Sequence, residues 1–172
     1  MSQLKDLMEI FLQPGELFVG DAGFKIRTIL GSCVSITLWH PGKRIGGMSH
    51  FLLASRGTIS RGQDLDGRYG DEALQSLIQQ LDSYGVSHLQ CQAKVFGGGN
   101  MFPDHCHAGA INVGQRNGEA ARSMLLAKNI PIVSESLFGV GHRQIVFDVS
   151  NGDVWSKQIR PSKLEIDVEN GT

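Results

Sequence analysis

The sequence lacks long hydrophobic runs, a surplus of charge of either sign and a disulfide framework. No segment of its 172 residues approaches the roughly 18 apolar residues of a membrane-spanning helix, so we expect no insertion into a membrane. The 16 Lys and Arg residues balance 17 Asp and Glu residues, which argues against nucleic-acid binding through a basic face. Three cysteines have no framework spacing, so we expect free thiols in a cytoplasmic protein.

The length fits a single domain with its own core. The first residues lack the basic start, continuous apolar stretch and cleavage site of a secretory signal peptide. Instead, four apolar side chains recur at helical spacing and predict a short amphipathic helix. They are Leu4, Leu7, Met8 and Phe11. We therefore divide the chain into an N-terminal helical extension at 1–13, a main domain at 14–160 and a C-terminal tail at 161–172.

Hydrophobic patterning predicts more strands than helices. Apolar periodicity indicates helices at 70–85 and 112–129, the second with Asn112 as its N-cap. Strand patterns fall at 16–20, 24–30, 33–41, 45–54, 88–96, 130–136, 143–150 and 153–159. Asn151-Gly152, between the last two strands, is a strong hairpin signal. We therefore expect a single mixed α/β domain, with largely antiparallel strands and helices packed on the sheet faces.

Cys33 follows Gly31 and Ser32 at the start of a predicted strand. Glycine permits a sharp backbone path there, and successive amides at such a turn can bind an anion. A cysteine nucleophile also needs a nearby base, and His50 lies 17 residues later on the next predicted strand. His40 is nearer in sequence but falls in a turn. These features leave two interpretations open, a buried thiol that only fills the core and a catalytic thiol activated by His50.

Two other motifs suggest ligand binding with less specificity. The glycine run at 97–99 lacks the G-x-G-x-x-G pattern and the Lys-Ser/Thr ending of nucleotide-binding loops. We interpret it as a tight turn that shapes a pocket wall. The segment 104–107, Asp-His-Cys-His, has metal-ligand types without their usual spacing, even with His88 or Cys91 added. We interpret it as a surface loop, and Cys91 as a core residue.

Five segments form an ordered set along the chain. They are GSCV at 31–34, GGMSHFLL at 46–53, RYGDEAL at 68–74, KVFGGGNMF at 94–102 and NVGQRN at 112–117. In order and separation they resemble the chemoreceptor glutamine deamidase family, CheD. No single segment is decisive, but five in order are specific, and the resemblance runs from roughly Pro14 to Phe147.

The resemblance implies a three-layer fold of helices and two β-sheets. It implies hydrolysis of particular chemoreceptor glutamines to glutamate, with release of ammonia, by a Cys-His-Thr triad that needs no metal or organic cofactor. Cys33 matches the family nucleophile, and His50 matches the base at the same 17-residue interval. The family threonine often lies six residues before the cysteine, where this chain has Arg27. We assign its role to the next residue, Thr28.

In the implied mechanism His50 holds Cys33 as the thiolate and Thr28 orients the imidazole. Backbone amides at Gly31 and Ser32 bind the oxyanion. The expected substrates are the cytoplasmic helices of methyl-accepting chemoreceptors, with a CheC-type phosphatase as a further partner, and nothing in the sequence demands more than a monomer. The alternative is a non-catalytic adaptor module that binds chemoreceptors or CheC, which the displaced threonine slightly favours.

Overall fold

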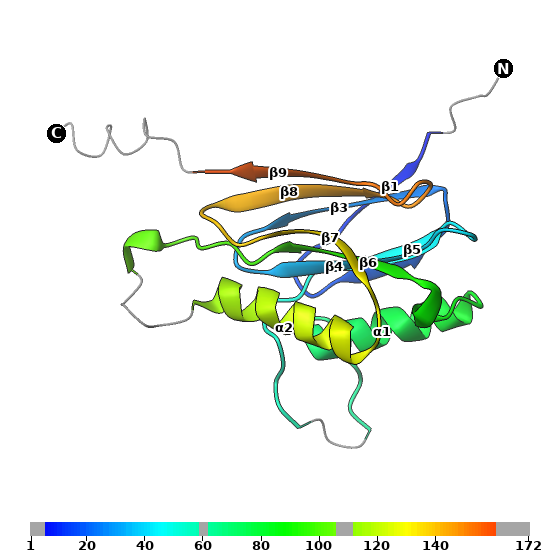
Figure 1. Cartoon of the computed structure of the whole chain (residues 1–172), viewed down its shortest axis with the longest axis horizontal. Helices are drawn as coiled ribbons and strands as arrows, with labels where there is room; N and C mark the ends of the chain where they lie inside the picture. Colours follow the sequence, from blue (N-terminus) through cyan, green and yellow to red (C-terminus); the bar gives the residue numbers. More distant parts are fainter. Residues whose placement is uncertain (1–5, 59–61, 106–111, 161–172) are drawn as a thin grey trace.

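The computed structural model describes residues 6–58, 62–105 and 112–160, and they form three layers (Figure 1). The first layer holds the helices α1 (Gly70–Ser83) and α2 (Val113–Ala127). The central sheet contains, in spatial order, β2 (Leu17–Gly20), β5 (Ile45–Ser49), β4 (Val34–His40), β6 (Gln92–Gly97) and β7 (Ile132–Leu137). The outer sheet contains β1 (Met8–Phe11), β3 (Phe24–Leu30), β8 (His142–Asp148) and β9 (Val154–Ile159).

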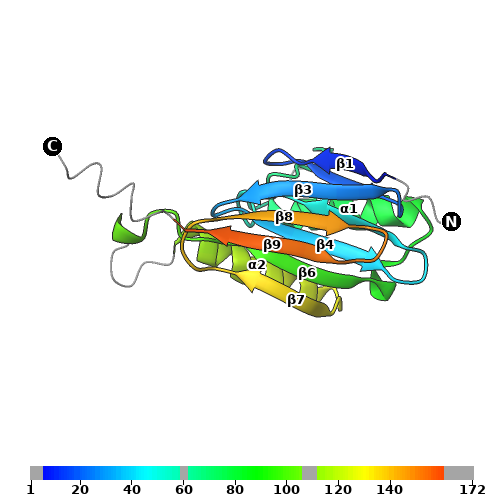
Figure 2. The ribbon, with the colours of Figure 1, turned by 90° about the horizontal axis from the view of Figure 1, so that it is seen from above.

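The pairing of the strands is mixed, as Figure 2 shows for the outer sheet. The β1–β3 and β6–β7 pairs are parallel, and the other five described pairs are antiparallel. Two short 3₁₀ helices, η1 (His88–Gln90) and η2 (Pro103–His105), lie in connections. The predicted mixed, largely antiparallel α/β fold in three layers is therefore confirmed.

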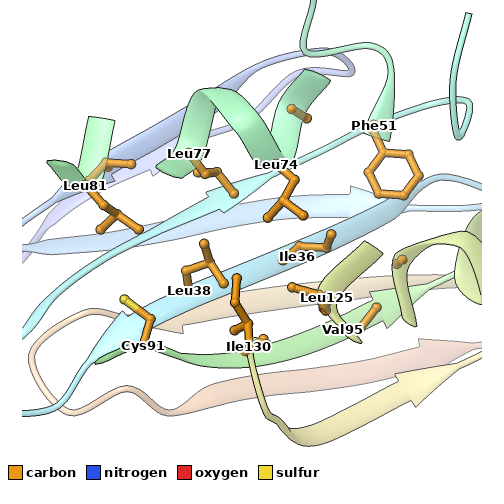
Figure 3. Packing of buried hydrophobic residues seen from close by; sticks show 14 of the residues in the cluster. Ile36, Leu38, Phe51, Leu74, Leu77, Leu81, Cys91, Val95, Leu125 and Ile130 are labelled. Atoms are coloured by element: carbon orange, nitrogen blue, oxygen red, sulfur yellow. The ribbon is translucent and has the colours of Figure 1, made fainter. Parts of the chain in front are cut away.

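Both helices bury an apolar stripe against the central sheet (Figure 3). Leu74, Leu77 and Leu81 come from α1, and Ala121 and Leu125 from α2. We call this cluster the helix-side core. Full burial of a leucine side chain is worth about 1.5–3 kcal/mol, so these stripes fix both helices on the sheet. Among the described helices, none combines the length and the hydropathy that crossing a membrane requires.

The central strand β4 is buried on both faces because it belongs to the middle layer. Val34, Ile36 and Leu38 pack in the helix-side core, where Figure 3 labels Ile36 and Leu38. Ser35 and Thr37 alternate with them and are also buried, toward the outer sheet. A second cluster, which we call the inter-sheet core, fills the space between the two sheets. It contains Leu12, Ile26, Leu30, Met48, Phe96, Ile145, Phe147 and Val149.

The N-terminal residues form a strand where the sequence predicts a helix. Met8–Phe11 is β1, and it pairs with β3 in parallel. The next residue, Leu12, is only 2% exposed in the inter-sheet core and donates its N–H to the Arg27 carbonyl at 2.8 Å. A helix this short is unstable by itself, whereas the strand gains backbone hydrogen bonds from the sheet. The prediction of a helical extension at 1–13 is therefore wrong for residues 8–11.

Other local predictions have mixed outcomes. The Asn112 side chain caps α2 by accepting the Gln115 N–H at 2.7 Å, and the hairpin at Asn151-Gly152 joins β8 and β9. The strand expected at 88–96 begins instead with η1 and is regular only in β6. The proposed tail at 161–172 and the first five residues lie outside the described ranges, and the domain boundaries stay predictions.

Candidate active site

Thr28 and His50 meet between the two sheets. Both are buried, each with 2% exposure. Thr28 Oγ1 lies 2.7 Å from His50 Nδ1 and donates its own hydrogen to the Leu12 carbonyl at 2.8 Å. Because a hydroxyl carries one hydrogen, Nδ1 must be the protonated ring nitrogen and Thr28 the acceptor. His50 Nε2 is then left unprotonated and able to accept a proton.

The alternation of β3 decides which residue contacts the histidine. Thr28 points inward with Ile26 and Leu30, while Arg27 is exposed and pairs with Glu9 at 3.3 Å on the outer face. Side chains on a strand alternate between faces, so Arg27 cannot reach His50 from its position. The structure therefore brings Thr28 to His50 despite its offset in sequence.

Cys33 and His50 lie on the same face of the central sheet. The Cys33 side chain packs against the inter-sheet core. The His50 side chain points the same way, toward Thr28 of the outer sheet. The Val34–Phe51 bridge and the β4–β5 register place Cys33 diagonal to His50 rather than directly opposite. Diagonal neighbours on a sheet remain within reach of long side chains.

The backbone of His50 is hydrogen-bonded to the residues just before β2, the strand on the opposite side of β5 from β4 and Cys33. Its N–H donates to the Glu16 carbonyl at 3.1 Å, and its carbonyl accepts from the Gly15 N–H at 2.8 Å. His50 is thus held at its backbone by Gly15 and Glu16 and at its imidazole by Thr28. This leaves little freedom for the ring to turn away from the position that Thr28 dictates.

Burial favours the neutral form of both groups. It raises the pKa of the Cys33 thiol and lowers the pKa of His50 to about 4. At neutral pH the resting pair is therefore a thiol beside a neutral imidazole. The expectation that His50 holds Cys33 as a resting thiolate is not what this environment favours. For Cys33 to attack a substrate, its proton would have to be transferred to a base during the attack.

Burial of a neutral His50 makes the stability of the protein depend on pH. The folded-state pKa of about 4 lies below the ordinary 6.5, so between these values the unfolded chain binds a proton that the folded chain does not. The free energy of unfolding should be unaffected by this group above pH 6.5 and should fall by about 3 kcal/mol as pH drops to about 4. Urea titrations across this range measure it. The variant His50→Asn should lose this fall in the free energy of unfolding. If the variant keeps the same dependence of stability on pH as the wild type, the prediction is contradicted.

The backbone of the glycine run is in direct contact with the turn that carries Cys33. Gly98 donates its N–H to the Cys33 carbonyl, and Gly99 to the Gly31 carbonyl, both at 2.9 Å. Gly97 has a φ of 111°, and a Cβ at this position would overlap the Cys33 carbonyl oxygen. Only glycine allows this approach. The predicted pocket wall is also present, in a pocket of about 270 Å³ lined by Gly98, Asn100, Asn112, Gln115, Phe138 and Gly139.

Arg143 supports the glycine run from the outer sheet, a role that sequence reasoning missed. It is 2% exposed and lies opposite Leu30. Its guanidinium donates to the Gly97 carbonyl at 2.8 Å and to the Phe138 carbonyl. Arg143 shares the inward face of β8 with the apolar Ile145. In the sequence, the sign of this role is an arginine that takes the place of an apolar residue in the alternating pattern of a predicted strand.

The amides of the Cys33 turn are free to bind an anion. The carbonyls of Gly31, Ser32 and Cys33 all accept hydrogen bonds. The N–H groups of Ser32 and Cys33 donate to no acceptor within the described residues. Unpaired amides beside a thiol are an arrangement that can bind an oxyanion.

The metal interpretation of segment 104–107 stays untested, since residues 106–111 are outside the described ranges. Cys91, considered as a further ligand, is 2% exposed in the helix-side core. This burial confirms the prediction of a core residue, and it raises the pKa of the Cys91 thiol to about 11. No group of three or more His, Cys, Asp or Glu side chains suited to a metal occurs in the part of the chain that the structure covers.

Comparison with known proteins identifies close relatives. The family model described as CheD chemotactic sensory transduction matches residues 52–158. A protein of Albidiferax ferrireducens named a probable chemoreceptor glutamine deamidase CheD 2 is 64% identical over 161 residues, covering 94% of this chain and 93% of its own. A Pseudomonas savastanoi pv. phaseolicola protein named a probable chemoreceptor glutamine deamidase CheD is 43% identical over 162 residues, covering 94% and 90%. These relatives extend the match across the segment that carries Thr28, Cys33 and His50.

Proposed function

The chain belongs to the CheD family, and on this basis we propose that it is a chemoreceptor glutamine deamidase, an amide hydrolase that acts in chemotaxis. We assign Cys33 as the nucleophile, His50 as the base and Thr28 as the residue that orients the imidazole. The observation that carries the assignment is the 2.7 Å contact between Thr28 Oγ1 and His50 Nδ1. It commits Nδ1 to the threonine and leaves Nε2 for the Cys33 proton.

The first half of the reaction forms a thioester. Cys33 Sγ attacks the side-chain carbonyl carbon of the substrate glutamine while His50 Nε2 accepts the thiol proton. The carbonyl oxygen becomes an oxyanion, which accepts hydrogen bonds from the free amides of Ser32 and Cys33. The C–N bond then breaks, the imidazolium returns its proton to the nitrogen, and ammonia leaves.

The second half releases the acid. His50 removes a proton from water, the hydroxide attacks the thioester carbon, and the C–S bond breaks as the proton returns to Cys33 Sγ. The net reaction consumes one water and yields glutamate and ammonia. Thr28 accepts the Nδ1 hydrogen throughout, so it stabilises the imidazolium that forms twice in each turnover. Each turnover adds a negative charge to the receptor helix, which repels neighbouring carboxylates.

The test is mass spectrometry of a chemoreceptor cytoplasmic fragment incubated with the protein, together with an assay for ammonia. Conversion of specific glutamines to glutamates, with one ammonia per conversion, is the expected result. A fragment that binds the protein but keeps all its glutamines under every condition would instead identify a non-catalytic adaptor. The threonine offset gives no support to that alternative, because Thr28 does contact His50.

Replacing Thr28 separates the contribution of its hydroxyl from that of its shape. Thr28→Val keeps the volume but removes the acceptor for Nδ1–H, so the other histidine tautomer becomes accessible. We expect kcat to fall by about 10–10²-fold with little change in KM. Thr28→Ser retains the hydroxyl and is the matched control, with most of the activity preserved. Equal activity in the valine variant and the wild type would remove Thr28 from the triad.

We further propose that the protein works as a cytoplasmic monomer on chemoreceptor cytoplasmic helices, and that a CheC-type phosphatase binds it. Membership of the family supports the chemoreceptor partner, and the CheC-type partner follows only from the resemblance noted in the sequence. Light scattering of the protein alone and mixed with a CheC-type protein measures its oligomeric state and the complex. A stable homodimer, or the absence of a complex, would contradict the corresponding part of this proposal.

A further inference from the structure

The two chain segments that carry the proposed nucleophile and base separate just beyond their last backbone bridge. Val34 and Phe51 exchange both backbone hydrogen bonds, at 3.1 and 3.0 Å. In a continued antiparallel ladder, the next hydrogen-bonded pair would be Ser32 and Leu53. That pair does not form within the described structure. The segments therefore fork beside Cys33.

Leu53 has other partners that keep the fork open. Its N–H donates to the Arg68 carbonyl at 3.2 Å, and its carbonyl accepts from the Gly70 N–H, where α1 begins, at 2.8 Å. Ser32 thus loses both of its ladder partners. Its N–H becomes one of the free amides of the turn, while its carbonyl needs a new donor to stay satisfied.

Asn117 of α2 supplies that donor and joins the two sides of the fork. The side chain is 1% exposed, and its Nδ2 donates to the Ser32 carbonyl at 3.1 Å and to the Leu52 carbonyl at 2.7 Å. One amide group therefore satisfies one carbonyl on each diverging segment. Asn117 lies four residues before Ala121 on the buried face of α2, where an apolar side chain would be the ordinary choice.

From this geometry we infer that Asn117 is a positioning residue for the oxyanion. By holding the Ser32 carbonyl toward α2, it turns the peptide unit at Ser32–Cys33 so that the Cys33 N–H faces away from α2, and it prevents the fork from closing on the Ser32 N–H. Asn117 acts through the backbone and touches neither the sulfur nor the imidazole in the contacts described. This inference rests on the proposed function for the identity of the nucleophile.

Two reactions of the same thiol separate this role from general support of the fold. Acyl transfer from p-nitrophenyl acetate to Cys33 Sγ forms a thioester, releases p-nitrophenol and passes through an oxyanion. Alkylation by iodoacetamide forms a thioether, releases iodide and passes through none. We expect Asn117→Asp and Asn117→Ala to slow acylation by about 10²-fold, and alkylation by less than about threefold. The receptor assay should show the loss in kcat rather than KM.

Ala121→Gly is the matched control. Ala121 is fully buried one turn further along α2, so glycine there weakens the helix without touching the fork. We expect this variant to lower the melting temperature and to leave the ratio of the two rates unchanged. Asn117→Ala keeps the test decisive if the carboxylate of Asn117→Asp prevents folding.

The outcomes distinguish this inference from the proposed function. If the acylation and alkylation rates of the Asn117 variants fall by the same factor, or if neither rate falls, the positioning role is overturned. Wild-type Cys33 that acylates no faster than free cysteine would also overturn it, because the amides would then bind no oxyanion. Wild-type protein that acylates rapidly but leaves receptor glutamines intact would refute the deamidase proposal alone, and the ratio of rates would still decide the role of Asn117.

Discussion

Replacement of Cys33 by alanine should abolish glutamine deamidation, with a loss of at least about 10⁴-fold in kcat. The variant keeps the turn, the free amides and His50, but it has no atom that can form the thioester. Mass spectrometry of the receptor fragment and the ammonia assay, run beside the wild type, measure the loss. Cys33→Ser should be nearly as inactive, because a neutral imidazole that is hard to protonate activates a serine hydroxyl poorly.

The matched control for this experiment is the other described cysteine. Cys91→Ala removes a thiol from the helix-side core, a cluster that contains neither Thr28 nor His50. We expect it to cost about 1 kcal/mol of stability and to leave kcat unchanged. A Cys33→Ala variant that deamidates at the wild-type rate would refute the mechanism, and the control shows whether loss of a thiol alone affects the assay.

Replacement of His50 by alanine should lower kcat by about 10³-fold or more, since it removes the group that is proposed to accept the thiol proton. It should also slow alkylation of Cys33, which reports on the activation of the sulfur without a receptor substrate. Stopped-flow alkylation and the receptor assay measure the two effects. The Thr28 hydroxyl would lose its ring partner but keep its bond to the Leu12 carbonyl.

The pH profile of the wild type follows from the pKa of His50. The imidazole must be neutral to accept the proton, and with a pKa of about 4 it stays neutral through the physiological range. The acid limb of kcat/KM should therefore fall near pH 4 rather than near 6.5. His40→Ala is the matched histidine control and should leave the profile unchanged, because the His40 side chain lies at the end of β4, where its Nδ1 accepts the Lys43 N–H. An acid limb near pH 6.5 would contradict the role of burial.

The site shows how far local patterns extend. The turn before Cys33 and the strand after it are visible in the sequence, because glycine and alternating apolar residues have local consequences. The offset of the threonine was misleading, since counting residues back from Cys33 does not show which side of β3 faces inward. Thr28 reaches His50 because the β3–β8 pairing and the inter-sheet core fix that side. The prediction of an N-terminal helix is wrong for a related reason, because β3, the hydrogen-bonding partner of β1, is distant in sequence.

The sequence by itself determined the fold class and the two helices with their buried stripes, which depend on periodicity and turn chemistry, both local properties. Its resemblance to the CheD family, rather than local pattern, singled out Cys33 and His50 as the proposed nucleophile and base. Only the tertiary structure decided the tautomer of His50, the neutral resting state of the thiol, and the fork that Asn117 holds open. Each of these depends on burial or on a hydrogen bond between segments distant in the chain, and such contacts exist only once the layers have packed.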